Sequence, residues 1–251
     1  MSPRWPQILM YHAVCPPPNN PNEIFTSPKL FQAQMHYLKR RNLRGVSMRE
    51  LRRAESTGNA KNLVGLTFDD GYDDFLQNAL PVLERFGFSA TVFVVGGMLG
   101  EKNNWEFRYN PRPQMKLLGV GGIREISARG IEVGSHSMTH AKLSGLGPES
   151  LEEEVSGSRQ VLSEVLGKAV DGFCYPYGAI DSASVQAVRK ARYAYACATF
   201  VRVERNAYDL PRVTVAEDNL LRFAMKLRIY SQYARAKRIY SRYRLTGPPW
   251  P

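Results

Sequence analysis

Short apolar runs alternate along the chain with amphipathic stretches of helical spacing. Seven short runs rich in β-branched or aromatic residues predict strands, at residues 8–14, 63–68, 90–95, 131–134, 172–175, 195–199 and 212–215. Between them, apolar residues recur at spacings of three and four, which predicts helices over residues 27–41, 76–86, 122–128, 151–166 and 183–191. This alternation predicts a parallel sheet, either open or closed into a barrel. Seven strands without a glycine-rich phosphate loop favour a barrel over a dinucleotide-binding fold.

The segment after residue 218 has a different composition from the rest of the chain. Residues 219–251 contain eight basic residues and no acidic one, so they supply eight of the eleven net positive charges. We therefore divide the chain into a catalytic domain, residues 1–218, and a basic amphipathic C-terminal extension, residues 219–251. An apolar helical stripe runs through the extension at Leu220, Phe223, Leu227, Tyr230 and Tyr233.

This basic helix has two interpretations that the sequence leaves open. It could lie on an anionic membrane surface, or it could pack its apolar stripe on the domain with its charged face in water. No nucleic-acid-binding motif accompanies the charge, so nucleic acid is not an expected partner.

The composition of the 251 residues is that of an ordinary globular protein. The three cysteines, Cys15, Cys174 and Cys197, are odd in number and far apart, which argues against a disulfide framework or a zinc ribbon. The N-terminal apolar run is too short and too polar for a secretory signal. We therefore expect a cytoplasmic protein that could contact the inner face of the membrane peripherally.

A pair of aspartates and a pair of histidines each follow a predicted strand. The run "LTFDDGYDDF" places Asp69 and Asp70 side by side, which costs free energy unless a positive charge compensates them. The run "EVGSHSMTH" places His136 and His140 four residues apart, so both imidazoles can face one ion if the segment turns helically. A divalent cation held by one aspartate and two histidines would leave the other aspartate free to act as a base.

Two further acidic residues and a later turn complete the chemical motifs. Asp73 and Asp74 are expected to cap the helix that starts near Phe75. The run D-D-G-Y-D-D lacks the alternate-position ligands of a calcium loop. In "GFCYPYGAID", Pro176 and Gly178 predict a turn, whose backbone N–H groups could stabilise an oxyanion.

The motifs "TFDDG", "HSMTH" and "YPYG", in this order, resemble those of the polysaccharide deacetylases (NodB-like, carbohydrate esterase family four). The resemblance extends over "ILMYHAV", "SATVFVV" and "LPRVTV", from about residue 8 to residue 215. It implies a distorted (β/α)7 barrel, here with the basic C-terminal helical extension. It also implies metal-dependent removal of an N-acetyl group from an amino sugar.

The resemblance assigns roles residue by residue. Asp69 matches the catalytic base, and Tyr177 matches the tyrosine whose backbone N–H contributes to the oxyanion hole. The metal ligands are Asp70, His136 and His140, and the metal is usually zinc, which also suits one carboxylate and two imidazoles. The expected substrate partner is a carbohydrate or a glycolipid.

The chain departs from the family pattern at two points. Cys174 stands where many members carry an arginine that orients the base, and Arg212 in "LPRV" is a candidate replacement from another strand, with a surface ion pair as the alternative. No histidine follows His140 to serve as the general acid, so His12, at the end of "ILMYH", is the candidate for that role. We also mark candidate contacts with the substrate: Pro176, Trp105 and Arg212.

Two alternative functions remain open from the sequence. The same metal, water and base would hydrolyse another C–N bond, such as a formamide or a cyclic amide. A non-catalytic carbohydrate-binding module is the alternative outside the enzymes, and the cysteine at position 174 is the feature that favours it.

Overall fold

A computed structural model describes residues 7–16, 25–105, 114–199, 206–215 and 219–228. Strands and helices alternate along the chain, as the sequence predicts. The strands are β1 (Gln7–Tyr11), β2 (Arg44–Val46), β3 (Leu63–Phe68), β4 (Thr91–Val94), β5 (Glu132–Ser135), β6 (Gly172–Cys174), β7 (Tyr195–Ala198), β8 (Leu210–Pro211) and β9 (Val213–Thr214). The α-helices are α1 (Pro28–Arg40), α2 (Met48–Ser56), α3 (Leu80–Phe86), α4 (Val120–Ala128), α5 (Pro148–Glu152), α6 (Ser158–Leu166) and α7 (Ser182–Lys190).

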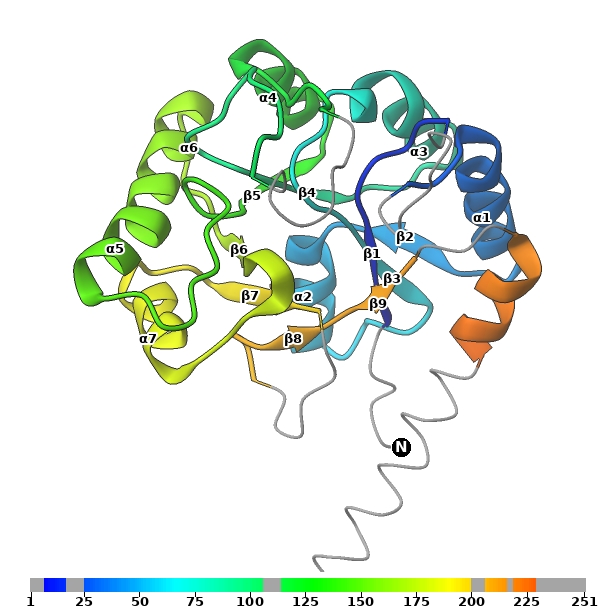
Figure 1. Ribbon diagram of the computed structural model, residues 1–251. Coiled ribbons are helices and arrows are strands. Elements are labelled where there is room, and N and C mark those ends of the chain that lie inside the picture. The colour runs from blue at the N-terminus through cyan, green and yellow to red at the C-terminus, as the bar shows by residue number, and fades with distance from the viewer. Residues whose placement is uncertain (1–6, 17–24, 106–113, 200–205, 216–218, 229–251) are drawn as a thin grey trace, which may run out of the picture.

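The strands form a parallel barrel with helices on its outside (Figure 1). Neighbouring strands pair in the order β8-β7-β6-β5-β4-β3-β1-β9, with β2 on the side of β3. Only Arg212 separates β8 from β9, so one short segment bonds to β7 at its start and to β1 at its end. This segment closes the ring of strands, which confirms the predicted barrel.

The sequence missed β2, β8 and α2. Strand β8 has only two residues, one of them a proline. Strand β2 is three residues long and includes a glycine, which is too little for a periodic pattern. Helix α2 is mostly charged, yet Ser47 caps its N-terminus by accepting a hydrogen bond from the backbone of Glu50. The Ser-x-x-Glu spacing is a capping signal that could have located this helix.

Two helices that the sequence predicts as continuous contain π-helical turns. The π turn η1 (Phe75–Ala79) precedes α3, and the π turn η2 (Glu153–Gly157) lies between α5 and α6. Such turns are frequent at functional sites because the extra residue redirects the side chains beside it.

Alternation along each strand divides the barrel into an inner and an outer face. Ile8, Phe93, Tyr195 and Cys197 belong to one buried cluster, in the interior of the barrel. Leu9, Leu66, Val92, Phe173 and other strand residues of opposite parity pack with the helices in a second cluster. Toward the carboxyl ends of the strands, the inward-facing residues are polar, and these polar residues form the candidate site described below.

Residues 220–228 are helical and pack beside α1. Phe223 is 1% exposed, and its ring lies 6.0 Å from that of Tyr37. Leu227 is buried as well, and its carbonyl accepts a hydrogen bond from Gln7. This part of the basic extension therefore packs on the domain, whereas the proposed boundary at residue 218 stays a prediction and residues 229–251 lie outside the described residues. Among the described residues, no helix combines the length and the apolarity that crossing a bilayer requires.

Gly134 on β5 makes room for the aromatic ring at the centre of the barrel. A Cβ at this position would lie 2.5 Å from Phe93 Cδ1, whereas a Cβ on Gly121 in α4 would meet no atom within 4 Å. Gly134→Ala is therefore expected to lower the free energy of unfolding by about 1–3 kcal/mol. Gly121→Ala should leave it unchanged or raise it by up to about 1 kcal/mol. Urea unfolding of both variants measures the difference, and equal stabilities would contradict the packing described here.

Candidate active site

The residues singled out in the sequence converge at the carboxyl ends of the strands. His12 follows β1, Asp69 follows β3, His136 follows β5 and Tyr177 follows β6, while Arg212 lies between β8 and β9. In barrel enzymes the carboxyl edge is where residues from different strands meet to form the active site.

Asp69 is held by a buried guanidinium. Arg212 Nη1 and Nη2 donate to the two carboxylate oxygens of Asp69 at 2.6 and 2.7 Å. The side chain of Arg212 is fully buried and also donates to the Ala198 carbonyl and the Thr67 hydroxyl. A surface ion pair, one of the two expectations for Arg212, is therefore wrong. Burial alone would raise the pKa of Asp69, but the guanidinium outweighs it and holds this pKa below its usual value.

Cys174 completes this cluster. Its Sγ accepts from Arg212 Nη2 at 3.0 Å and lies 3.7 Å from Asp69 Oδ2. Burial raises the pKa of the thiol, so the side chain is a neutral neighbour of the ion pair. The residue at the position where many family members carry an arginine thus contacts the guanidinium of Arg212, which lies between β8 and β9.

Asp70, His136 and His140 form a second buried cluster beside Asp69. Oδ1 of Asp70 lies 3.3 Å from Nε2 of His136 and 3.3 Å from Nε2 of His140. Nδ1 of His136 lies 2.8 Å from the Cys174 carbonyl, so it carries the proton and leaves a lone pair on Nε2. Among the described residues, no hydrogen-bond donor satisfies Asp70 Oδ1. The ligand atoms of these three buried residues converge within 4.8 Å of one another, so the residues suit the divalent metal that the sequence predicts.

The backbone brings the two imidazoles together in a way that the sequence did not predict. The segment after β5 does not turn helically; Ser137 and His140 instead adopt positive φ angles of 66° and 63°. The Ser137 hydroxyl accepts from the backbone N–H of His140 at 3.1 Å. Strain of this kind persists where surrounding contacts impose it, which is common at functional sites.

Glu154 supplies those contacts, and the sequence analysis missed it. This buried carboxylate of the π turn η2 accepts from the backbone N–H groups of Met138 and Thr139, each at 3.0 Å, and from the Thr139 hydroxyl. It therefore fixes the segment that carries both histidines. The available signal was an acidic residue three positions after Leu151 and four before Ser158, on the buried face of the predicted helix.

His12 faces the same site from β1. Its Nε2 lies 4.0 Å from Asp69 Oδ2. Burial lowers the pKa of His12, and this outweighs the opposite effect of the Asp70 and Asp69 carboxylates. A lowered pKa makes the protonated ring a stronger acid.

The segment that follows His12 is hydrogen-bonded to the π turn η1 and to the residue before it. The Asp74 carboxylate accepts from the backbone N–H of Val14 at 2.5 Å, and the Asn78 side chain donates to the Val14 carbonyl at 2.7 Å. The expectation that Asp73 and Asp74 cap a helix is therefore wrong for Asp74, which makes no side-chain capping bond. Asp73 instead lies 3.8 Å from the Lys116 ammonium.

Aromatic side chains border the histidine cluster. Trp105 stacks on His140 with ring centroids 4.5 Å apart, and Tyr177 meets the same ring edge-on at 4.7 Å. Tyr177 has a positive φ of 58°, in the turn Pro176–Gly178, and its side chain is exposed. The structure thus places both predicted aromatic residues beside a candidate metal ligand, with Pro176 buried in the adjoining turn.

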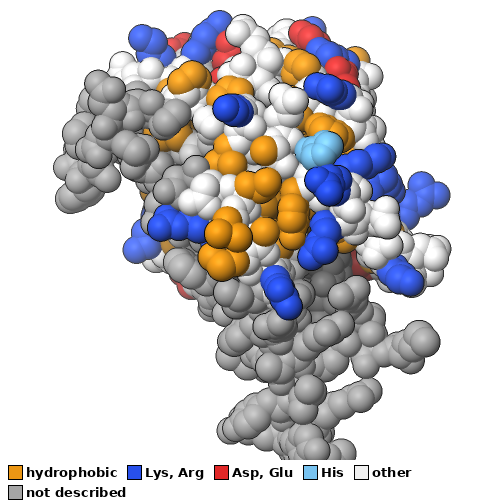
Figure 2. All heavy atoms as spheres, turned by 90° about the vertical axis from the view of Figure 1, so that its right-hand side faces the viewer, with side chains coloured by type: hydrophobic (Ala, Val, Ile, Leu, Met, Phe, Trp, Pro, Cys, Tyr) orange, Lys and Arg blue, Asp and Glu red, His pale blue; other side chains and the backbone are white. Residues whose placement is uncertain are grey.

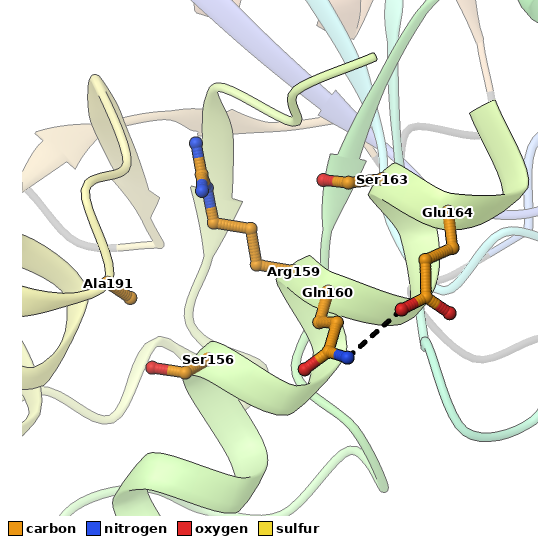
Figure 3. A pocket seen from close by; sticks show the side chains of 6 residues that line it. All are labelled: Ser156, Arg159, Gln160, Ser163, Glu164 and Ala191. Carbon is orange, nitrogen blue, oxygen red and sulfur yellow. Dashed lines mark hydrogen bonds between the residues drawn. The ribbon is translucent and has the colours of Figure 1, made fainter. Parts of the chain in front are cut away.

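A surface hollow elsewhere has a different character. It has a volume of about 440 Å³ and lies along α6, on the outside of the barrel (Figure 3). Polar side chains line most of it, and a Gln160–Glu164 hydrogen bond crosses its rim. It shares no residue with the cluster of Asp70, His136 and His140, so it takes no part in the site described above.

The barrel and its acidic and imidazole clusters define a hydrolase-type site, and comparison with known proteins identifies the family. The family model described as polysaccharide deacetylase matches residues 56–196. The chain belongs to the polysaccharide deacetylase family.

Individual relatives agree with this assignment. The Bacillus subtilis protein YxkH is 28% identical over 214 residues, which cover 83% of this chain and 71% of that protein. The poly-β-1,6-N-acetyl-D-glucosamine N-deacetylase of Staphylococcus aureus is 23% identical, over 76% of this chain and 68% of its own.

Solved structures are similar as well. A polysaccharide deacetylase from Bacillus cereus has a TM-score of 0.71 and 26% identity, covering 88% of this chain and 68% of that one. IcaB from Ammonifex degensii has a TM-score of 0.71 and 27% identity, covering 84% and 92%.

The role of Glu154 can be tested separately from catalysis. Glu154→Gln removes the charge that holds Met138 and Thr139, so the affinity for Zn²⁺ or Co²⁺ is expected to fall about 10- to 100-fold. Competition with a chromophoric chelator measures this affinity. Glu153→Gln is the matched control, because that neighbouring side chain is exposed. Equal affinities of the two variants would show that the carboxylate does not support the histidine segment.

Proposed function

We propose that the protein is a metal-dependent hydrolase that removes an N-acetyl group from an amino sugar of a polysaccharide, an oligosaccharide or a glycolipid. The observation that carries the proposal is the pairing of two buried clusters. One holds an ionised carboxylate, Asp69, on a guanidinium, and the other presents three converging ligand atoms directly beside it. A non-catalytic binding module would have no use for a base held in this way.

The proposed ligands of the cation are Asp70, His136 and His140, and zinc suits this set of one carboxylate and two imidazoles. When bound, the cation would supply a Lewis acid beside the acyl carbonyl. The residues of the chain carry the proton transfers. Asp69 accepts the proton of the attacking water, because its low pKa keeps it ionised. His12, 4.0 Å from that carboxylate, donates a proton to the departing amine.

Tyr177 and Trp105, at the edge of the site, are proposed to contact the substrate. The backbone N–H of Tyr177 is the proposed donor to the developing oxyanion. The rings of Trp105 and Tyr177, which flank His140, offer apolar surface against which a sugar ring can lie. The name of the Staphylococcus relative, a poly-N-acetylglucosamine deacetylase, supports an N-acetylglucosamine-containing substrate. A cytoplasmic location and peripheral contact with an anionic membrane through residues 219–251 stay predictions.

The reaction is tested by metal content and acetate release measured together. Asp69→Asn is expected to keep about one metal per chain and to lose about 10²- to 10⁴-fold in acetate release. The assay offers N-acetylglucosamine oligomers to protein supplied with zinc, cobalt or manganese. Asp73→Asn, a nearby acidic position outside both clusters, should retain activity.

Other outcomes of this assay decide between the alternatives. Bound metal without acetate from any acetylated sugar would favour hydrolysis of another C–N bond. A protein that binds no metal under these conditions would favour a carbohydrate-binding module.

The orienting role of Arg212 gives a separate prediction. Arg212→Lys keeps the charge but cannot form the forked pair with Asp69, so kcat should fall by about 10- to 10³-fold with little change in KM. Cys174→Ser should retain most activity, because the hydroxyl can accept from the guanidinium as the thiol does. Combining Arg212→Gln with Cys174→Arg should recover part of the lost kcat by returning a guanidinium to the motif position. Wild-type kcat in Arg212→Lys would contradict the proposed role.

A further inference from the structure

The helix of residues 220–228 has apolar side chains on two opposite faces. Phe223 and Leu227 pack on the domain, whereas Leu221 and Met225 are 69% and 47% exposed. At 100° per residue, Leu221 and Met225 lie one turn apart on the side opposite Phe223. Apolar residues around most of a helix are typical of one that is covered from both sides. Among the residues that the structure describes, the domain covers only one side of this helix, which leaves the outer face, hereafter the 221/225 face, open to a further partner.

Positive charge surrounds the 221/225 face. The helix itself carries Arg222, Lys226 and Arg228 without an acidic residue. The neighbouring α1 likewise has no acidic residue, and its C-terminal end exposes Lys39, Arg40 and Arg41. Figure 2 looks onto this side of the molecule, where apolar surface at the centre is bordered by lysine and arginine and acidic side chains gather at the upper edge.

The helix is anchored firmly enough to present this face. Tyr37 of α1 packs edge-on against Phe223, and the Arg41 guanidinium lies 5.6 Å from the centre of the Tyr37 ring. Gln7 and Lys226 add hydrogen bonds that join the helix to the first and last strands of the barrel. The exposed apolar pair and its basic border therefore keep a fixed position relative to the barrel.

We infer that the 221/225 face docks on an anionic membrane surface. Leucine and methionine side chains enter the headgroup boundary, and the surrounding cations lie among anionic headgroups. A second copy of the chain is disfavoured as the occupant, because it would bring the same positive charge against this face. The remaining residues of the chain, 229–251, add five basic residues and no acidic one, which strengthens the attraction to an anionic surface. This inference does not depend on which bond the enzyme hydrolyses.

The test is flotation of the full-length chain with vesicles of phosphatidylcholine alone or mixed with phosphatidylglycerol. The wild type is expected to float only with the anionic vesicles and to be released by salt. Leu221→Gln combined with Met225→Gln should reduce the bound fraction about tenfold or more, through loss of apolar burial. Val120→Gln is the matched control, since Val120 is 40% exposed at the start of α4, outside the 221/225 face.

Thermal unfolding and light scattering of each variant separate membrane docking from misfolding and from dimer formation. Unchanged unfolding of the double variant together with lost flotation supports membrane docking. Flotation equal to that of the wild type would overturn it, as would a wild type that ignores anionic vesicles. A dimer that the double variant dissociates would instead assign the face to a second copy. Acetate release from a soluble oligosaccharide should be unaffected, so failure of this inference is distinct from failure of the proposed reaction.

Discussion

The pairing of Arg212 with Asp69 joins the closure of the barrel to the chemistry of its site. Arg212 lies between β8 and β9, the two short strands that complete the ring, and its guanidinium donates to Asp69 and to the Ala198 carbonyl at the end of β7. Removing one partner of a buried ion pair typically costs about 3–5 kcal/mol, because the other charge stays buried. The carboxylate can thus be ionised inside the barrel only while the closing segment is in place.

A second set of contacts supports the first from outside the barrel. Two helices contain π turns, and in each the turn directs polar side chains toward a strand end. In η2, Glu154 fixes the backbone that carries the histidines, and in η1, Asn78 bonds to the segment after His12. Parallel strands bring the reactive groups to one edge, whereas the helices set how each group is held there.

Much of this arrangement could be predicted from the sequence because it follows from local patterns. The runs of β-branched and aromatic residues located seven of the eight strands of the ring, and the paired aspartates and histidines stood directly after two of them. Helix α2 was missed because it is mostly charged, and strands β2 and β8 were missed because they are only three and two residues long. The left-handed turn at His140 and the support from Glu154 depend on contacts between distant segments. The local spacing of apolar residues cannot predict such contacts.

The position of Cys174 bears on how degenerate members of such a family are recognised. A scoring scheme that counts motif residues would mark this chain as defective, because Cys174 stands where many members carry an arginine. Yet the guanidinium of Arg212, 38 residues further along the chain and between β8 and β9, contacts the Cys174 sulfur and donates to the Asp69 carboxylate through Nη1 and Nη2. The sequence position that supplies the positive charge can therefore change while the contact is kept. Loss of function is better judged by whether any cationic side chain contacts the carboxylate at the position of Asp69.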